Sequence, residues 1–119
     1  MFKIEDDFIY LTRGDTAYIT LELEDEDKFF VGDIVALSVK RNLTSESIYA
    51  LHKEKIVDEE SNTLVIKIKP EDTNDMSYGL YYYDIQLTRT NGDVFTIITP
   101  DKDDLRANFK LLKEVTQNE

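Results

Sequence analysis

The stretch GLYYYDIQLT, residues 79–88, decides the fold class because apolar and polar side chains alternate along it. A period of two places every second side chain on the same face of an extended strand. One face carries the more apolar set: Tyr81, Tyr83, Ile85 and Leu87. Tyr82 lies on the opposite face among polar neighbours. A long strand with one apolar face is typical of the centre of an antiparallel sheet that packs one side on a core.

The same alternation recurs along most of the chain. Further strands are predicted at residues 8–11, 17–24, 35–40, 48–53, 64–69 and 94–99. The pair Asn91-Gly92 tolerates positive φ and predicts a tight type I′ hairpin between residues 88 and 94. Residues 105–115 fit a helix or a strand, and we favour the strand because a helix would expose Leu111 or crowd it against the sheet. The sequence therefore predicts an all-β fold, an immunoglobulin-like antiparallel β-sandwich of about seven or eight strands.

Length and composition are those of one self-sufficient domain. The 119 residues are 41% hydrophobic and include four glycines, two prolines and no cysteine. A chain of this length buries enough apolar surface to fold without disulfides, and its low glycine and proline content argues against a linker. We expect a single domain over residues 1–119, with frayed ends at about residues 1–6 and 116–119.

The charge balance restricts the partners. Twenty-five acidic residues against 14 basic ones give a formal net charge of −11. A phosphate backbone would be repelled, so we expect no nucleic-acid binding. The N-terminus has no basic segment followed by an apolar run, and no stretch approaches the roughly 18 apolar residues of a membrane span. We therefore expect a soluble chain with no membrane contact.

Patterns for catalysis or metal binding are sparse. His52 is the single histidine, no nucleophile motif accompanies it, and Lys53 beside it opposes its protonation. Residues 101–104, DKDD, offer oxygen ligands but lack the glycine and distant glutamate of a calcium loop. The tripeptide at Arg13 matches an adhesion motif, but its glycine and its place between two strands favour a turn. We expect no catalytic residue, cofactor or metal site, while calcium binding by the acidic loops stays open.

Four aromatic residues are the candidate partner-binding residues. Tyr82 and Tyr18 fall on strand faces that the alternation assigns to solvent, where tyrosine serves either strand propensity or an interface. They would share one surface if their strands belong to one sheet. Phe29 and Phe30 follow the acidic run at residues 24–27 and cannot both face a core. We expect one of these two to cap the core and the other to contact a partner.

Turn and strand-start motifs occur in a distinctive order along the chain. They are RGDT at 13–16, GD at 32–33, PEDT at 70–73, the strand from Gly79, and GDVFTI at 92–97. This order resembles the N-terminal domain of baseplate upper proteins and related tail or neck proteins of phages and prophages of Gram-positive bacteria, over about residues 10–115. The resemblance implies an immunoglobulin-like sandwich that serves as a docking module in a virion. The run from Asp75 to Tyr81 is also similar to the tyrosine corner of immunoglobulin domains, with inserted residues and no cysteine after it.

The expected function is that of a non-enzymatic structural adaptor in a phage tail or baseplate. Such a chain would be made in the host cytoplasm and assembled into the virion by binding other phage structural proteins or itself, as a homo-oligomer. Two alternatives stay open. One is an acidic inhibitor or DNA mimic that binds a basic host protein, and the other is a carbohydrate-binding module that stacks sugars on Tyr82 and Tyr18.

Overall fold

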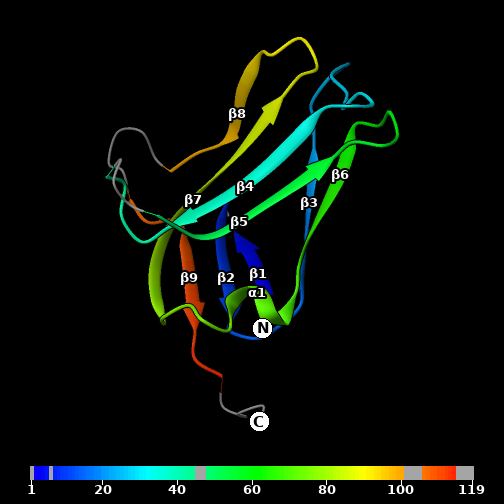
Figure 1. Cartoon of the computed structure of the whole chain (residues 1–119). Coiled ribbons are helices and arrows are strands. Elements are labelled where there is room, and N and C mark those ends of the chain that lie inside the picture. The colour runs from blue at the N-terminus through cyan, green and yellow to red at the C-terminus, as the bar shows by residue number, and fades with distance from the viewer. Residues whose placement is uncertain (1, 6, 45–47, 101–105, 115–119) are drawn as a thin grey trace.

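The computed structural model describes residues 2–5, 7–44, 48–100 and 106–114. This part of the chain is an all-β sandwich of nine strands with one short helix (Figure 1). In chain order the elements are β1 (Phe2–Glu5), β2 (Phe8–Thr12), β3 (Ala17–Glu22), β4 (Ile34–Lys40), β5 (Tyr49–Ile56), β6 (Thr63–Ile68), α1 (Pro70–Thr73), β7 (Gly79–Thr88), β8 (Val94–Ile98) and β9 (Phe109–Leu112).

The two sheets are unequal in size. Seven strands form the large sheet in the order β1-β2-β9-β7-β4-β5, and β8 pairs with the far half of β7. The small sheet consists of β3 and β6 alone. Neighbouring strands are antiparallel except β2 and β9, which run parallel. The long strand β7 pairs with β9 near its start and with β8 near its end.

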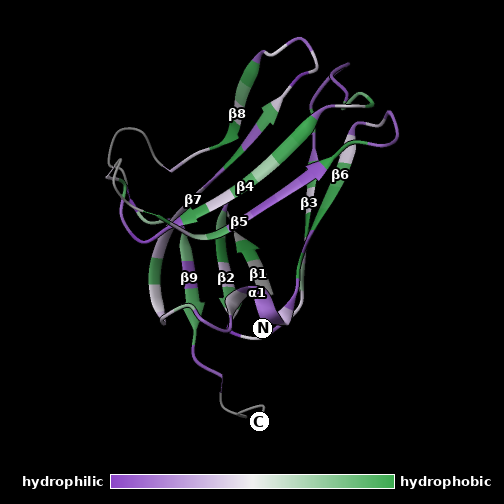
Figure 2. Cartoon of the chain, in the orientation of Figure 1, coloured by the Kyte–Doolittle hydropathy of each residue, from purple (hydrophilic) through white to green (hydrophobic). Residues whose placement is uncertain are grey.

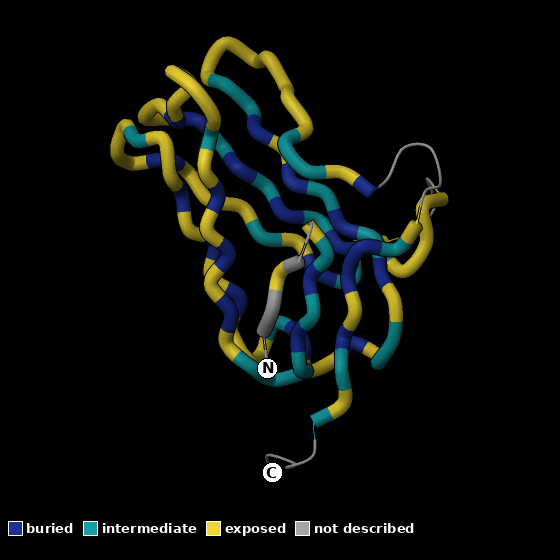
Figure 3. The backbone as a smooth tube through the Cα atoms, turned by 180° about the vertical axis from the view of Figure 1, so that it is seen from behind, coloured by how far each residue is buried: buried dark blue, intermediate teal, exposed yellow. Residues whose placement is uncertain are grey.

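The core lies between the sheets and follows the alternation in the sequence. Buried and exposed residues alternate along the strands (Figure 3), and the four apolar residues of β7 all face inward. Phe109 packs edge-on against Tyr81 and Tyr83, with ring centroids 6.1 and 6.3 Å away. Every strand predicted from the alternation is present, and the C-terminal stretch contains a strand as expected. The prediction of an all-β sandwich is confirmed.

Two local expectations are wrong. Residues 2–5 were expected to fray, but they form β1 and pair with β2, which gives the chain a ninth strand. The turn after β7 is not type I′, because Gly92 has a φ of +94° and Asn91 does not have positive φ. The Asn91 side chain accepts the Asp93 N–H at 2.9 Å instead, and Arg89 N–H donates to the Asp93 carbonyl at 2.8 Å. This is a three-residue loop closed by a glycine bulge, a common alternative in hairpins.

A tyrosine hydrogen bond closes the corner that leads into β7. Tyr81 Oη donates to the Ser77 carbonyl at 2.6 Å, which ties the start of the strand to the loop after α1. Gly79 has a φ of +126°, and a Cβ there would lie 2.9 Å from the Arg41 guanidinium. That guanidinium donates to the Leu80 carbonyl at 3.1 Å and lies 4.7 Å from the centre of the Tyr81 ring. A side chain at position 79 would therefore disturb the corner.

One asparagine completes the large sheet where β7 has no neighbouring strand. β9 ends its pairing at Tyr81 and β8 begins at Ile85, so the main-chain groups of Tyr83 fall in the gap between them. The buried Asn108 side chain donates to the Tyr83 carbonyl at 2.9 Å and accepts the Tyr83 N–H at 2.8 Å. Its main chain bonds to Tyr81 and to Ile9 of β2. Asn108 thus connects β2, β7 and β9.

Replacing Asn108 with alanine is expected to destabilise the domain by about 2–4 kcal/mol, because two buried main-chain groups lose their partners. Urea unfolding followed by circular dichroism measures this change. Lys110→Ala, at an exposed position of the same region, is the control and should change the stability by less than about 0.5 kcal/mol. A loss of less than about 1 kcal/mol for Asn108→Ala would show that the bridge is dispensable.

Candidate docking surfaces

Tyr82 lies on the outer face of the large sheet, near its centre. Its strand has β9 and β8 on one side and β4 on the other, and the half-buried Tyr82 stands directly opposite Lys40 of β4. Lys40 in turn pairs with Tyr49 of the edge strand β5, and its ammonium group lies 5.0 Å from the centre of that ring. The orientation expected from the alternation is therefore correct.

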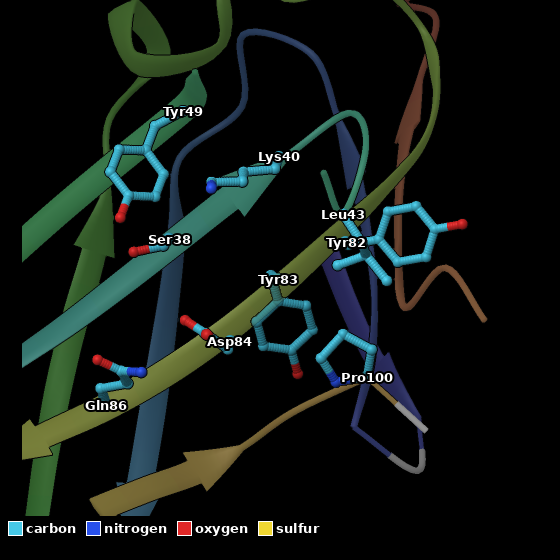
Figure 4. Close-up of a pocket in the computed structure, with 9 residues that line it drawn as sticks. All are labelled: Ser38, Lys40, Leu43, Tyr49, Tyr82, Tyr83, Asp84, Gln86 and Pro100. Carbon is cyan, nitrogen blue, oxygen red and sulfur yellow. The ribbon is translucent and has the colours of Figure 1, made fainter. Parts of the chain in front are cut away.

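A shallow pocket of about 180 Å³ opens on this face between β4, β5 and β7 (Figure 4). Polar side chains and the rings of Tyr49 and Tyr82 line it together with the inward-facing Tyr83. The full set is Ser38, Lys40, Leu43, Tyr49, Tyr82, Tyr83, Asp84, Gln86 and Pro100. Figure 4 shows Tyr49 and Tyr82 on either side of Lys40. The hollow thus places aromatic rings next to polar side chains on the outer face of the sheet.

Asp84 is the one carboxylate among the described residues that line this pocket. It is half-buried, and no described residue forms a hydrogen bond or ion pair with its carboxylate. Burial raises its pKa above the ordinary value, while the nearby charges of Lys40 and His52 act in the opposite direction. A half-buried carboxylate whose pKa is raised by folding lowers the stability of the domain at neutral pH.

His52 has partners that the sequence did not reveal. Its Nδ1 lies 3.0 Å from Ser38 Oγ, its Nε2 lies 3.0 Å from Glu54 Oε1, and its ring stacks on Tyr49 at 4.8 Å. Ser38 stands directly opposite His52 in the register of β4 and β5. The contact is thus a cross-strand pair on an open sheet face, where such polar pairs stabilise a sheet. We interpret it as structural.

Tyr18 does not share a surface with Tyr82. It lies in β3 of the small sheet, 56% exposed, and Lys67 of β6 lies 5.6 Å from the centre of its ring. The two tyrosines belong to different sheets and point outward from each. The condition for a common surface, that both strands belong to one sheet, is therefore not met, and the core separates the two tyrosines.

Of the two adjacent phenylalanines, one is buried and the other is exposed, as the sequence predicts. Phe29 is fully buried and its main chain bridges to Ser61, so it is a core residue and not an interface residue. Phe30 is 47% exposed. The Arg89 guanidinium lies 5.3 Å from its ring centre and forms a 2.6 Å ion pair with the buried Asp33, which also accepts the Phe30 N–H. These contacts fix Phe30 in an exposed position.

The remaining sequence motifs fall into turns or outside the described residues. Gly14 has a φ of +86° and its N–H donates to Thr73 Oγ1 at 2.8 Å, while Arg13 forms a 2.8 Å ion pair with Glu114. The tripeptide is therefore a folded turn whose arginine is engaged. The acidic stretch 101–104 lies outside the described residues.

No metal site or membrane span is evident within the described residues. They contain no group of three or more histidine, cysteine, aspartate or glutamate side chains arranged to hold a metal ion. None of the helices described there has the length and apolarity needed to cross a membrane.

Comparison of the chain with models of protein families, with curated proteins and with solved structures gave no match. The resemblance to phage structural proteins is therefore carried by the sequence motifs alone.

The Asp84→Asn variant is expected to be more stable than the wild type at pH 7. A carboxyl group whose pKa is raised by folding adds stability below its ordinary pKa and loses that contribution as the pH rises through the raised pKa. The melting temperature of Asp84→Asn should therefore exceed that of the wild type at pH 7 and equal it near pH 3. Asp58→Asn removes the same charge at an exposed position and is the control. Equal melting temperatures of wild type and Asp84→Asn at pH 7 would contradict the destabilising effect assigned to the Asp84 carboxylate.

Proposed function

We propose that this chain is a non-enzymatic structural adaptor of a tailed phage, located in the tail or baseplate, and that its sandwich is immunoglobulin-like. Its partner on the large sheet is another structural protein of the particle. The motif order of the sequence supports the phage assignment, and the geometry of the outer sheet face supports the adaptor role.

The strand order supports an immunoglobulin-like assignment. In those domains strands B and E pair in one sheet and strands C, F and G in the other, with an added C′ strand in the variable type. Here β3 and β6 take the places of B and E, and β5, β4 and β7 those of C′, C and F. β8 and β9 together take the place of G, divided into two pieces. The Tyr81 hydrogen bond stands at the corner before F, where a tyrosine corner belongs.

The observation that carries the adaptor role is a patch of exposed apolar residues around the pocket on the large sheet. We call it the sheet-face patch; it consists of Leu43, Tyr49 and Tyr82, which line the pocket, and Leu80, two residues before Tyr82 on the same face of β7. Leu43, Tyr49 and Leu80 are exposed, and Tyr82 is half-buried. Clustered aromatic and aliphatic side chains with polar groups at their margin match the composition of protein interfaces.

The placement of the tyrosines argues against the carbohydrate alternative in its expected form. Tyr18 and Tyr82 cannot form one stacking platform because they lie on opposite outer faces. We therefore favour a protein partner for this face.

Purified phage particles provide the test. The chain should be detected by mass spectrometry in particles from a strain that expresses it, and Tyr82→Ser should lower its incorporation by about tenfold or more, because a central tyrosine contributes about 2 kcal/mol to an interface. Tyr18→Ser makes the same change on the opposite face and should be incorporated at the wild-type level. Absence of the wild-type chain from particles would rule out the virion role, and equal incorporation of both variants would rule out the sheet-face patch.

A further inference from the structure

The free strand edges of the two sheets differ in their protection against additional strands. An unpaired edge binds further strands unless charges, proline or a covering segment block it. The edge strands β1, β3, β5 and β6 each contain at least one charged residue, and β5 contains Lys53, Glu54 and Lys55 in a row. β8 reads VFTII and contains none. In Figure 2, β5 is strongly hydrophilic toward its arrowhead, whereas β8 is largely hydrophobic or neutral.

Among the described residues, no strand other than β7 pairs with β8, and its outer edge has no strand partner there. Arg89 and Asp93 form a hydrogen-bonded pair at the base of the hairpin, and bonded and non-bonded pairs alternate in antiparallel strands. Phe95 is therefore bonded to β7, while Val94 and Thr96 direct their N–H and C=O groups toward the free edge. Four polar main-chain groups are available there to an incoming strand.

Apolar side chains stand beside this edge. Val94 is 55% exposed and Phe95 is 53% exposed. Phe95 and Phe30 line the same hollow of about 400 Å³, between the β7–β8 hairpin and the loop before β4. An added strand would therefore find main-chain partners at its side and aromatic surface for its inward side chains, which is the general mode of recognition by strand addition.

A group of joined loops lies beside the free edge of β8. Three loops meet at this end of the sandwich, residues 23–33, 57–62 and 89–93, and we call them the loop end (Figure 1). The Phe29 N–H donates to the Ser61 carbonyl at 2.7 Å, and an Arg89 Nη1 donates to the Lys28 carbonyl at 2.7 Å, so the loops are joined.

The loop end is strongly acidic. It carries eight exposed carboxylates: Glu24, Asp25, Glu26, Asp27, Asp58, Glu59, Glu60 and Asp93. Lys28 is its one exposed lysine, and Arg89 is paired with the buried Asp33. A basic segment would be attracted to this end, and a second copy of the chain would be repelled.

We propose that the free edge of β8 binds an extended segment of a partner protein as an added strand, with alternating apolar residues over β8 and lysine or arginine residues at the loop end. This interaction goes beyond the adaptor role proposed for the sheet-face patch and uses a different surface. The partner is identified by chemistry: an extended, apolar and basic peptide.

Nuclear magnetic resonance of the whole 15N-labelled chain tests this with a synthetic probe, the peptide Lys-Lys-Val-Thr-Val-Thr-Val-Lys-Lys. The amide signals of Val94 and Thr96 should shift on titration and become protected from hydrogen exchange. Thr96→Pro removes one edge N–H that is not bonded to β7 and should weaken binding about tenfold. Thr96→Val keeps the N–H and should bind within about twofold of the wild type. Raising the salt from low to physiological concentration should weaken binding.

Two further peptides keep the test independent of how well Thr96→Pro folds. A peptide with glutamate in place of lysine should bind at least tenfold more weakly, and a peptide N-methylated at both its valines and its threonines should not protect Val94 and Thr96. Shifts confined to residues away from β8, or equal binding of the lysine and glutamate peptides, would overturn the proposal. Protection of Val94 and Thr96 that rises with protein concentration without peptide would identify a second copy as the occupant and overturn it too. These measurements use no phage particles, so either proposal can fail without the other.

Discussion

The side-chain amide of Asn108 supplies the two hydrogen bonds on which the large sheet depends. The strand that should run beside the whole of β7 is divided into β8 and β9, and a divided strand leaves main-chain groups of its neighbour unpaired. Asn108 carries a donor and an acceptor on one planar group, which matches the donor and acceptor of Tyr83 in the gap. Because its own main chain also bonds to β2 and β7, the N-terminal strands, the central strand and the C-terminal strand are connected at this point.

The sequence predicted those features that depend on local pattern. Alternation placed the β7 residues correctly, since burial of one face fixes strand register strongly. The tyrosine corner could also be seen from the residues around Tyr81. In contrast, the Asn108 bridge and the ion pair of Asp33 with Arg89 join residues 25 and 56 positions apart, and nothing near either residue signals its partner. The pairing of Ser38 with His52 arises from the register of β4 on β5, which a single sequence does not specify.

Two surfaces with different chemistry emerge from one asymmetry in the sandwich. The small sheet has two strands and the large sheet has seven, so the β3–β6 pair leaves part of the large sheet, including β8, uncovered. Phe95 is therefore exposed, although it lies on the face of the large sheet that elsewhere packs against the core. The sheet-face patch, in contrast, lies on the outer face of the large sheet, around Tyr82. The sheet-face patch offers side chains to a partner, and the free edge of β8 offers main-chain groups beside the acidic loop end.

The parallel pairing of β2 with β9 gives the domain a definite response to tension. If the chain is pulled from both ends, β1 separates from β2 one residue pair at a time, because an antiparallel hairpin opens from its free end. The load then acts along the β2–β9 pair in opposite directions, so that all its hydrogen bonds, from Ile9 to Thr12, are stretched together. Rupture under force follows the rate of unfolding rather than the equilibrium stability. The domain would therefore lengthen slightly at low force and then resist sharply until β2 and β9 separate.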